Sequence, residues 1–312
     1  MKKILKTNGS GLLAIFIALV LTSYFAVIII KFPLVGLEVV ERNHQWIVDQ
    51  VYKNGWASSQ SIEEGDIIKL VNGKEPANHS TVKCFKRVEL AKTITILDKK
   101  SKIKTFSISY SPMDKQYIYL LFPFIFAVTT ISLSILLCRG CKDDRSAKLL
   151  IYFLLATGVC YLSAFASARG DMIGRITNTL TLTGSLILFI HFLKRYLLRF
   201  NLLFIKTESL LTLYILNTIV LLMLAVNHIW KLNFHIVIIQ LLLFLLLICF
   251  LLFNLIKLHL KSKNSDGHPV LKIIWITLFL AFSPFVCLYV IPIILMKKEL
   301  VPAEISAMFL II

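Results

Sequence analysis

Long apolar runs dominate the chain and predict membrane-spanning helices. A helix needs about 20 apolar residues to cross about 30 Å of hydrocarbon. The runs of that size are Gly11–Ile30, Tyr117–Cys138, Leu149–Ala168, Ile176–Leu193, Leu210–Trp230, His235–Ile256 and Ile273–Met296. An eighth run, Val301–Ile312, has 12 residues and reaches the last residue of the sequence, so we expect a truncated helix there. The pattern therefore predicts a polytopic α-helical membrane protein with seven complete spans and part of an eighth.

Residues 31–116 interrupt this pattern with alternating apolar and polar positions, which indicate strands. We expect strands at Leu34–Val40, Trp46–Tyr52, Asp66–Val71, Thr93–Leu97 and Ile103–Ile108, and a helix over Ser80–Ala91. Asn72-Gly73 is a strong signal for a tight turn. The expected layout is an N-terminal tail and first span in 1–30, a small α+β domain in 31–116, a six-helix membrane bundle in 117–296, and an outer turn with the truncated helix in 297–312.

The charges of this sequence orient it in the membrane. The chain is 57% hydrophobic and 16% charged, against about 25% charged in soluble domains, and its net charge is +17. With a cytoplasmic N-terminus, the inner segments hold 15 Lys and Arg and the short outer loops hold 5, as the positive-inside rule requires. We therefore expect a multi-pass protein of the plasma membrane with residues 31–116 outside the cytoplasm. Nucleic-acid binding is not supported.

Motifs for catalysis, metals and cofactors are missing from the sequence. None of the seven histidines begins an H-E-x-x-H motif, which excludes that class of intramembrane metalloprotease. There is no P-loop, and Gly184-Ser185-Leu186 departs from the G-x-S-x-G of a serine protease. The spans contain no Asp, Glu, Lys or Arg, so ion transport has no support, and their polar residues, such as Asn217 and Gln240, are expected to form interhelical hydrogen bonds. We expect no catalytic residue, no metal site and no cofactor.

The six cysteines are scattered along the chain. Cys84 is the only one in residues 31–116, so we expect no disulfide within that domain. Cys138 and Cys141 form a C-x-x-C without a second Cys or His pair nearby, which favours a packing role over a zinc or redox site.

The segment from Gly55-Trp56-Ala57 to Ser61-Ile62-Glu63-Glu64-Gly65-Asp66-Ile67-Ile68-Lys69-Leu70-Val71-Asn72-Gly73 resembles a PDZ domain of the bacterial type. Trp56 stands where the family has a small residue, and Ser61-Ile62 replaces Gly-Leu. The stretch Leu34, Val35, Gly36, Leu37 is similar to the family's carboxylate-binding loop. The resemblance implies a groove in which an extended peptide adds to the sheet edge. A PDZ fold kept for shape or dimerisation is the alternative.

The whole chain resembles the sensor half of ComP-type competence histidine kinases of Gram-positive quorum sensing. The most specific matching residues are Ser163-Ala164, Arg169-Gly170, Ile173, Arg175, Phe192-Leu193-Lys194-Arg195-Tyr196-Leu197, Phe282-Ser283-Pro284-Phe285 and Val290-Ile291-Pro292-Ile293-Ile294. The resemblance implies a secreted, isoprenylated ComX-like peptide pheromone as input. It also implies a homodimeric kinase and phosphotransfer to a ComA-like response regulator, through cytoplasmic domains absent from this chain.

In such a sensor we expect outer loops and helix ends to contact the pheromone. Arg169, Asp171 and Arg175 are our candidates for its polar end, with Trp230 and Phe234 as apolar neighbours, while the prenyl chain lodges between helices or at the bilayer edge. Two other functions stay open. The chain is alternatively a PDZ-containing membrane scaffold that recruits a partner without signalling, or the relic of a protease or transporter.

Overall fold

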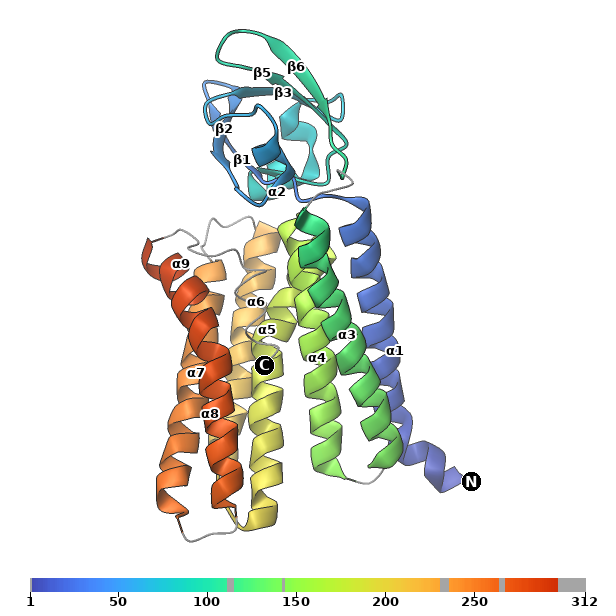
Figure 1. Ribbon diagram of the computed structural model, residues 1–312, viewed down its shortest axis with the longest axis vertical. Helices are drawn as coiled ribbons and strands as arrows, with labels where there is room; N and C mark the ends of the chain where they lie inside the picture. The colour runs from blue at the N-terminus through green and yellow to red at the C-terminus, as the bar shows by residue number, and fades with distance from the viewer. Residues whose placement is uncertain (1, 111–114, 142–143, 231–235, 264–266, 297–312) are drawn as a thin grey trace. The chain divides into compact units, whose positions relative to one another are not determined.

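The computed structural model describes residues 2–110, 115–141, 144–230, 236–263 and 267–296 (Figure 1). The chain divides into two compact units. We name them the sheet unit, which comprises Thr22–Leu121 and Leu162–Ile176, and the helical unit, which comprises Met1–Leu21, Phe122–Tyr161 and Thr177–Ile312. Each is described by itself.

The sheet unit is built on a six-stranded antiparallel sheet in the order β4-β1-β2-β3-β5-β6 (Figure 1). Its strands are β1 (Leu37–Arg42), β2 (Gln45–Val51), β3 (Ile67–Val71), β4 (Arg87–Val88), β5 (Thr93–Leu97) and β6 (Ile103–Ser107). Helix α2 (Ser80–Phe85) and the short 3-10 turns η1 (Trp56–Ser59) and η2 (Pro76–Asn78) complete it. Five of these strands lie where the alternating pattern predicts them.

Alternate residues of these strands form one apolar core. Leu37 and Val39 of β1 and Ile94 and Ile96 of β5 are almost fully buried, as period-2 patterning requires, and Trp56 packs with them. The predicted turn after β3 has both central residues in the left-handed region, Asn72 at φ 52° and Gly73 at φ 73°.

The predicted helix over Ser80–Ala91 is too long. Helix α2 ends at Phe85 because Lys86 adopts a left-handed conformation at φ 56°, and the next two residues form β4. The spacing of Val82, Phe85 and Val88 fits one face of a helix, but Val88 is buried as part of the sheet, where it pairs with Leu37.

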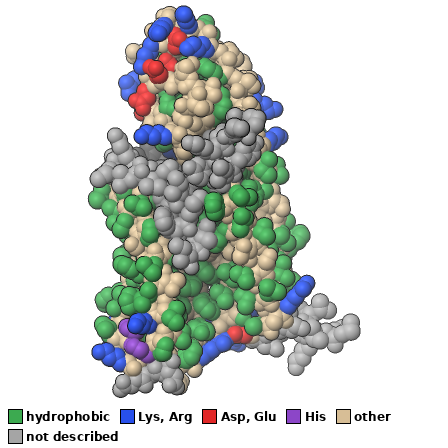
Figure 2. Space-filling model, in the orientation of Figure 1, with side chains coloured by type: hydrophobic (Ala, Val, Ile, Leu, Met, Phe, Trp, Pro, Cys, Tyr) green, Lys and Arg blue, Asp and Glu red, His purple; other side chains and the backbone are tan. Residues whose placement is uncertain are grey.

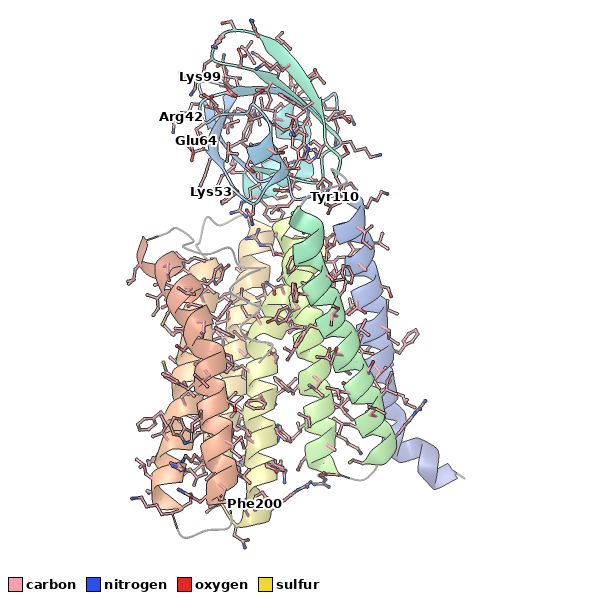
Figure 3. The ribbon with its side chains drawn as sticks, viewed as in Figure 1. Arg42, Lys53, Glu64, Lys99, Tyr110 and Phe200 are labelled. Atoms are coloured by element: carbon pink, nitrogen blue, oxygen red, sulfur yellow. The ribbon has the colours of Figure 1, made fainter. Side chains whose placement is uncertain are left out.

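Parts of four long helices belong to the sheet unit. They are the C-terminal part of α1 (Lys2–Lys31), the start of α3 (Lys115–Gly140), the end of α4 (Arg145–Ala168) and the start of α5 (Met172–Leu197). Tyr110, which follows the sheet, donates its hydroxyl to the carbonyls of Ile29 at 2.5 Å and Phe32 at 3.0 Å at the end of α1 (Figure 3). The sheet and these helix ends therefore form one packed body.

The helical unit contains the remaining helical segments. Besides parts of α1, α3, α4 and α5, these are η3 (Leu198–Phe200), α6 (Thr207–Trp230), α7 (Ile236–Lys261), α8 (His268–Phe285), η4 (Val286–Val290) and α9 (Ile291–Met296). Many of its large apolar side chains are exposed, such as Phe16, Val128 and Phe253, and hydrophobic side chains cover much of its visible face (Figure 2). A surface of this kind suits lipid.

Six described helices are long and apolar enough to cross a membrane. They are Gly9–Lys31, Leu121–Gly140, Arg145–Ala168, Met172–Phe200, Ile238–Lys261 and His268–Leu295. The predicted span Leu210–Trp230 coincides with α6, whose apolar stretch Thr207–Met223 is shorter than the others. The prediction of seven spans is therefore not confirmed, and the predicted eighth helix lies outside the described residues.

Polar residues of the spans form hydrogen bonds between helices, as predicted. Thr183 of α5 donates its hydroxyl to Oδ1 of Asn217 of α6 at 2.5 Å, and Gln240 of α7 donates Nε2 to the carbonyl of Thr179 at 3.3 Å. These bonds satisfy polar groups that lipid cannot.

Candidate functional site

The loop of residues 34–37, here termed the amide loop, directs the backbone N–H groups of Val35 and Gly36 toward one point. Its carbonyls are already used: the N–H of Trp56 donates to Leu34 at 2.7 Å, that of Ala57 to Val35 at 3.0 Å and that of Tyr52 to Gly36 at 2.9 Å. The N–H groups of Val35 and Gly36 point away from these carbonyl contacts. Such paired amides make an anion-binding concavity.

Gly36 is required for this loop geometry. Its φ is +74°, a value that favours glycine, and a Cβ at this position would lie 2.8 Å from the Cα of Gly55. Gly55 is equally constrained, since a Cβ there would lie 2.6 Å from the carbonyl oxygen of Val35. The two glycines let the amide loop and the start of η1 touch backbone to backbone.

A carboxylate from the same chain occupies the amide loop. Glu89 accepts the N–H of Val35 on Oε2 at 2.9 Å and the N–H of Gly36 on Oε1 at 2.8 Å, and only 1% of Glu89 is exposed. Its backbone is fixed by Thr81, whose hydroxyl accepts the N–H of Glu89 at 3.0 Å and donates to its carbonyl at 3.1 Å. The predicted carboxylate loop thus contacts a carboxylate, but one supplied from within.

The segment that carries Glu89 lies along the outer edge of β1. Strand β4 pairs antiparallel with β1, with Val88 opposite Leu37 and Arg87 opposite Glu38, and the N–H of Val39 donates to the carbonyl of Lys86 at 2.8 Å. The side chain of Val88 is completely buried. The edge on which the PDZ resemblance places an outside peptide is therefore paired along these residues.

Burial shifts the ionisation of Glu89. The loss of hydration raises the pKa of its carboxyl from 4.5 to about 7, although the two amide hydrogen bonds and the charges of Arg169 and Arg87 oppose this shift. The group is therefore near the midpoint of its titration at neutral pH.

The turn between α4 and α5, Arg169-Gly170-Asp171, packs against this site. Gly170 has φ +76°, and a Cβ added there would lie 2.7 Å from Cγ2 of Thr81 and 3.4 Å from Cβ of Glu89. Arg169 is 3% exposed and donates Nε to the carbonyl of Phe32 at 2.7 Å, Nη1 to that of Phe165 at 2.9 Å and Nη2 to the hydroxyl of Tyr110 at 3.4 Å. Its guanidinium therefore joins the end of α4 to the end of α1.

Asp171 and Arg175, two other candidate ligand contacts, also have partners within the sheet unit. Asp171 caps α5 by accepting the N–H of Gly174 on Oδ2 at 2.6 Å, and its Oδ1 accepts the hydroxyl of Tyr24 at 2.7 Å. The guanidinium carbon of Arg175 lies 4.5 Å from the centre of the Phe85 ring, in a cation–π contact.

The role of the two apolar candidates stays a prediction. Trp230 is the last residue of α6, in the helical unit, and Phe234 lies outside the described residues. The structure thus brings together Arg169, Asp171 and Arg175 with the amide loop, through contacts that the sequence does not reveal.

Glu89 and Thr81 are the residues that sequence reasoning missed. The available signal is an acidic residue inside the apolar run Val88-Glu89-Leu90-Ala91. Burial of a carboxylate is costly unless hydrogen-bond donors or cations lie next to it, so an acidic residue in such a run indicates a buried polar contact.

The chain is similar in sequence to a known kind of protein. No family model matches the chain, and no solved structure matches it. Sensor histidine kinase ComP of Bacillus subtilis (strain 168) is 26% identical to it in an alignment that covers 96% of this chain and 39% of ComP. The chain is homologous to the membrane sensor portion of ComP. The matched part is the N-terminal part of ComP, and together with the apolar helices it identifies a multi-pass membrane protein.

Proposed function

We propose that the chain is the sensor module of a two-component quorum-sensing histidine kinase. In this proposal it binds an extracellular isoprenylated peptide, as expected for a ComX-like pheromone, and relays binding to a cytoplasmic kinase of the ComP type with a ComA-like response regulator. The observation that carries the proposal is the similarity to the N-terminal part of ComP over 96% of the chain. The positive-inside count supports an extracytoplasmic position for residues 31–116.

The contacts in the sheet unit support a relay role. Arg169 joins α4 to the end of α1, Asp171 joins the start of α5 to Tyr24 of α1, and Gly170 lies so close to Thr81 of α2 that a Cβ would lie 2.7 Å from Cγ2. A displacement of the small domain would strain buried hydrogen bonds at the ends of three helices. Packed elements of this kind change between discrete arrangements, which suits a two-state sensor.

Direct contact of the pheromone with Arg169, Asp171 and Arg175 stays a prediction. The described hydrogen bonds and the cation–π contact give all three side chains partners inside the sheet unit. A ligand that reached them would have to replace those partners, so we now assign them first to holding the α4–α5 turn. The prenyl group would gain about 0.8 kcal/mol for each CH₂ buried between apolar helices or at the bilayer edge.

The described geometry weighs against the scaffold alternative. A PDZ scaffold needs a free strand edge and a free carboxylate-binding loop. Here β4 pairs with β1 at Leu37 and Glu38, and Glu89 occupies the amides of Val35 and Gly36.

Photo-crosslinking to membranes that contain the chain tests the pheromone proposal. The probe is a pool of short synthetic peptides, each carrying a farnesyl-length chain and a diazirine, and the control pool lacks the isoprenyl group. We expect saturable labelling of the chain that excess unlabelled prenyl peptide suppresses and prenyl alcohol does not. Labelling that never saturates, or that both pools give equally, would contradict the proposal.

A further inference from the structure

We infer that residues 86–89 are a built-in ligand of the sheet unit: they fill the groove formed by the amide loop and the edge of β1, and their carboxylate locks the α4–α5 turn. The inference rests on the geometry around Glu89 and does not depend on pheromone binding. It assigns the amide loop as a carboxylate site whose resident carboxylate belongs to Glu89.

Three features of residues 86–89 are those of an extended ligand added to a sheet. The segment runs antiparallel to β1 and shares main-chain hydrogen bonds with it, including the one from the N–H of Val39 to Lys86. It buries one apolar side chain, Val88, in the domain core. It then presents a carboxylate to two backbone amides at 2.8 and 2.9 Å. Main-chain pairing, an apolar anchor and carboxylate capture together define recognition of a peptide end.

The mode of attachment shows why a side chain can replace a peptide terminus. Leu90 is in the left-handed region at φ 54°, so the chain turns away directly after Glu89. The residues that follow Glu89 therefore leave the groove, while the side chain of Glu89 reaches the two amides.

The built-in ligand is connected to the ends of the long helices. Thr81 holds both backbone groups of Glu89, and Gly170 approaches Thr81 so closely that no Cβ fits between them. The groups that face Glu89 are the amides of the loop, Thr81 with His79 3.0 Å from its hydroxyl, and the cations Arg87 and Arg169. Removal of the carboxylate would leave two buried amides unpaired and withdraw the anion from these cations.

Replacement of Glu89 by alanine, followed by addition of acetate, tests the inference in the full chain reconstituted in lipid nanodiscs. Acetate restores the deleted carboxylate, and acetamide is the neutral control of the same shape. Hydrogen exchange of the segment that contains Val35 and Gly36 is the readout. The matched variant is Glu64→Ala, which removes an exposed carboxylate on the turn before β3 (Figure 3).

We expect roughly tenfold or faster exchange at these amides in Glu89→Ala. Acetate should restore the slow exchange, acetamide should not, and wild type and Glu64→Ala should respond to neither. The second arm uses a pentapeptide that copies residues 84–88 with serine in place of Cys84, acetyl-Ser-Phe-Lys-Arg-Val with a free carboxylate. It is added to the wild-type chain, and we expect no binding because residues 86–89 already occupy the groove. Unchanged protection in Glu89→Ala, rescue by acetamide as strong as by acetate, or saturable binding of the pentapeptide to wild type would each overturn the inference.

Glu89→Gln serves if the alanine variant fails to fold. Glutamine keeps the volume of the side chain but has one acceptor oxygen, and it turns an NH₂ group toward the second backbone N–H. We expect faster exchange at one or both of these amides in this variant. Wild-type protection at both amides would contradict a carboxylate site.

Discussion

Replacement of Gly170 by alanine measures how tightly the α4–α5 turn is bound to the small domain. Gly170 has φ +76°, where an L side chain costs about 1 kcal/mol or more. The new Cβ would also lie 2.7 Å from Cγ2 of Thr81. Thr81 must move, and its two hydrogen bonds to the backbone of Glu89 contribute about 1 kcal/mol each. Together these effects should lower the free energy of unfolding by about 3 kcal/mol.

Gly73→Ala is the matched control for this variant. Gly73 has nearly the same φ, +73°, but nothing lies within 4 Å of a Cβ built there. This variant should therefore cost about 1 kcal/mol from the backbone conformation alone. The difference between the two variants, about 2 kcal/mol, isolates the contact between the turn and Thr81.

Hydrogen exchange of residues 79–90 in nanodiscs compares the two variants. An additional loss of about 2 kcal/mol corresponds to exchange that is roughly 30-fold faster in Gly170→Ala than in Gly73→Ala. Equal acceleration in the two variants would refute the close contact and, with it, the coupling of the turn to the Glu89 site.

Three further predictions concern the same unit. Asp171→Ala should lower the free energy of unfolding by about 1 kcal/mol for the helix cap and further for the bond to Tyr24; a double-mutant cycle with Tyr24→Phe in detergent should give a coupling energy near 1–2 kcal/mol, and zero coupling would contradict the bond. Arg169→Lys keeps the charge but lacks the planar guanidinium fork that serves three acceptors, so hydrogen exchange at the ends of α1 and α4 should accelerate; wild-type rates would contradict this role. The pKa of Glu89 is raised from 4.5 to about 7 in the folded state, so the folded state binds the proton more tightly than the unfolded state does. The stabilisation that protonated Glu89 contributes is therefore present below pH 4.5 and is lost as the pH rises to 7. The loss is up to about 3 kcal/mol; the unfolding midpoint of wild type should fall more between pH 4.5 and 8 than that of Glu89→Gln, and parallel profiles would contradict a raised pKa.

The regular elements of this chain could be predicted from local patterns. Burial of alternate residues in β5 and the left-handed turn at Asn72-Gly73 depend on neighbours in sequence, and so does the apolarity of the six candidate spans. The misassigned segment after Phe85 shows the limit of this method. A spacing of three residues fits a helix, but pairing with β1 decides the conformation of Val88.

The candidate site could be predicted only in part, for a related reason. The residues Leu34 to Leu37 predict the amide loop, and the positions of Arg169 and Asp171 predict charges near helix ends. Their actual partners are backbone carbonyls and hydroxyls far away in sequence, such as those of Phe32 and Tyr24. Periodicity contains no information on such contacts, so the sequence alone does not distinguish a buried, partnered charge from one that is available to a ligand.

Autophosphorylation of a chimera tests the central claim, that this chain is a sensor module, most directly. Residues 1–312 are joined in frame to the part of Bacillus subtilis ComP that follows the matched region, and the phosphorylated protein is measured in membrane vesicles with the prenyl peptide pool or the unprenylated pool. The account predicts a saturable change in phosphorylation with the prenyl pool alone, and a smaller response in Gly170→Ala than in Gly73→Ala. A phosphorylation level that is the same with both pools, in a chimera that folds and autophosphorylates, would contradict it.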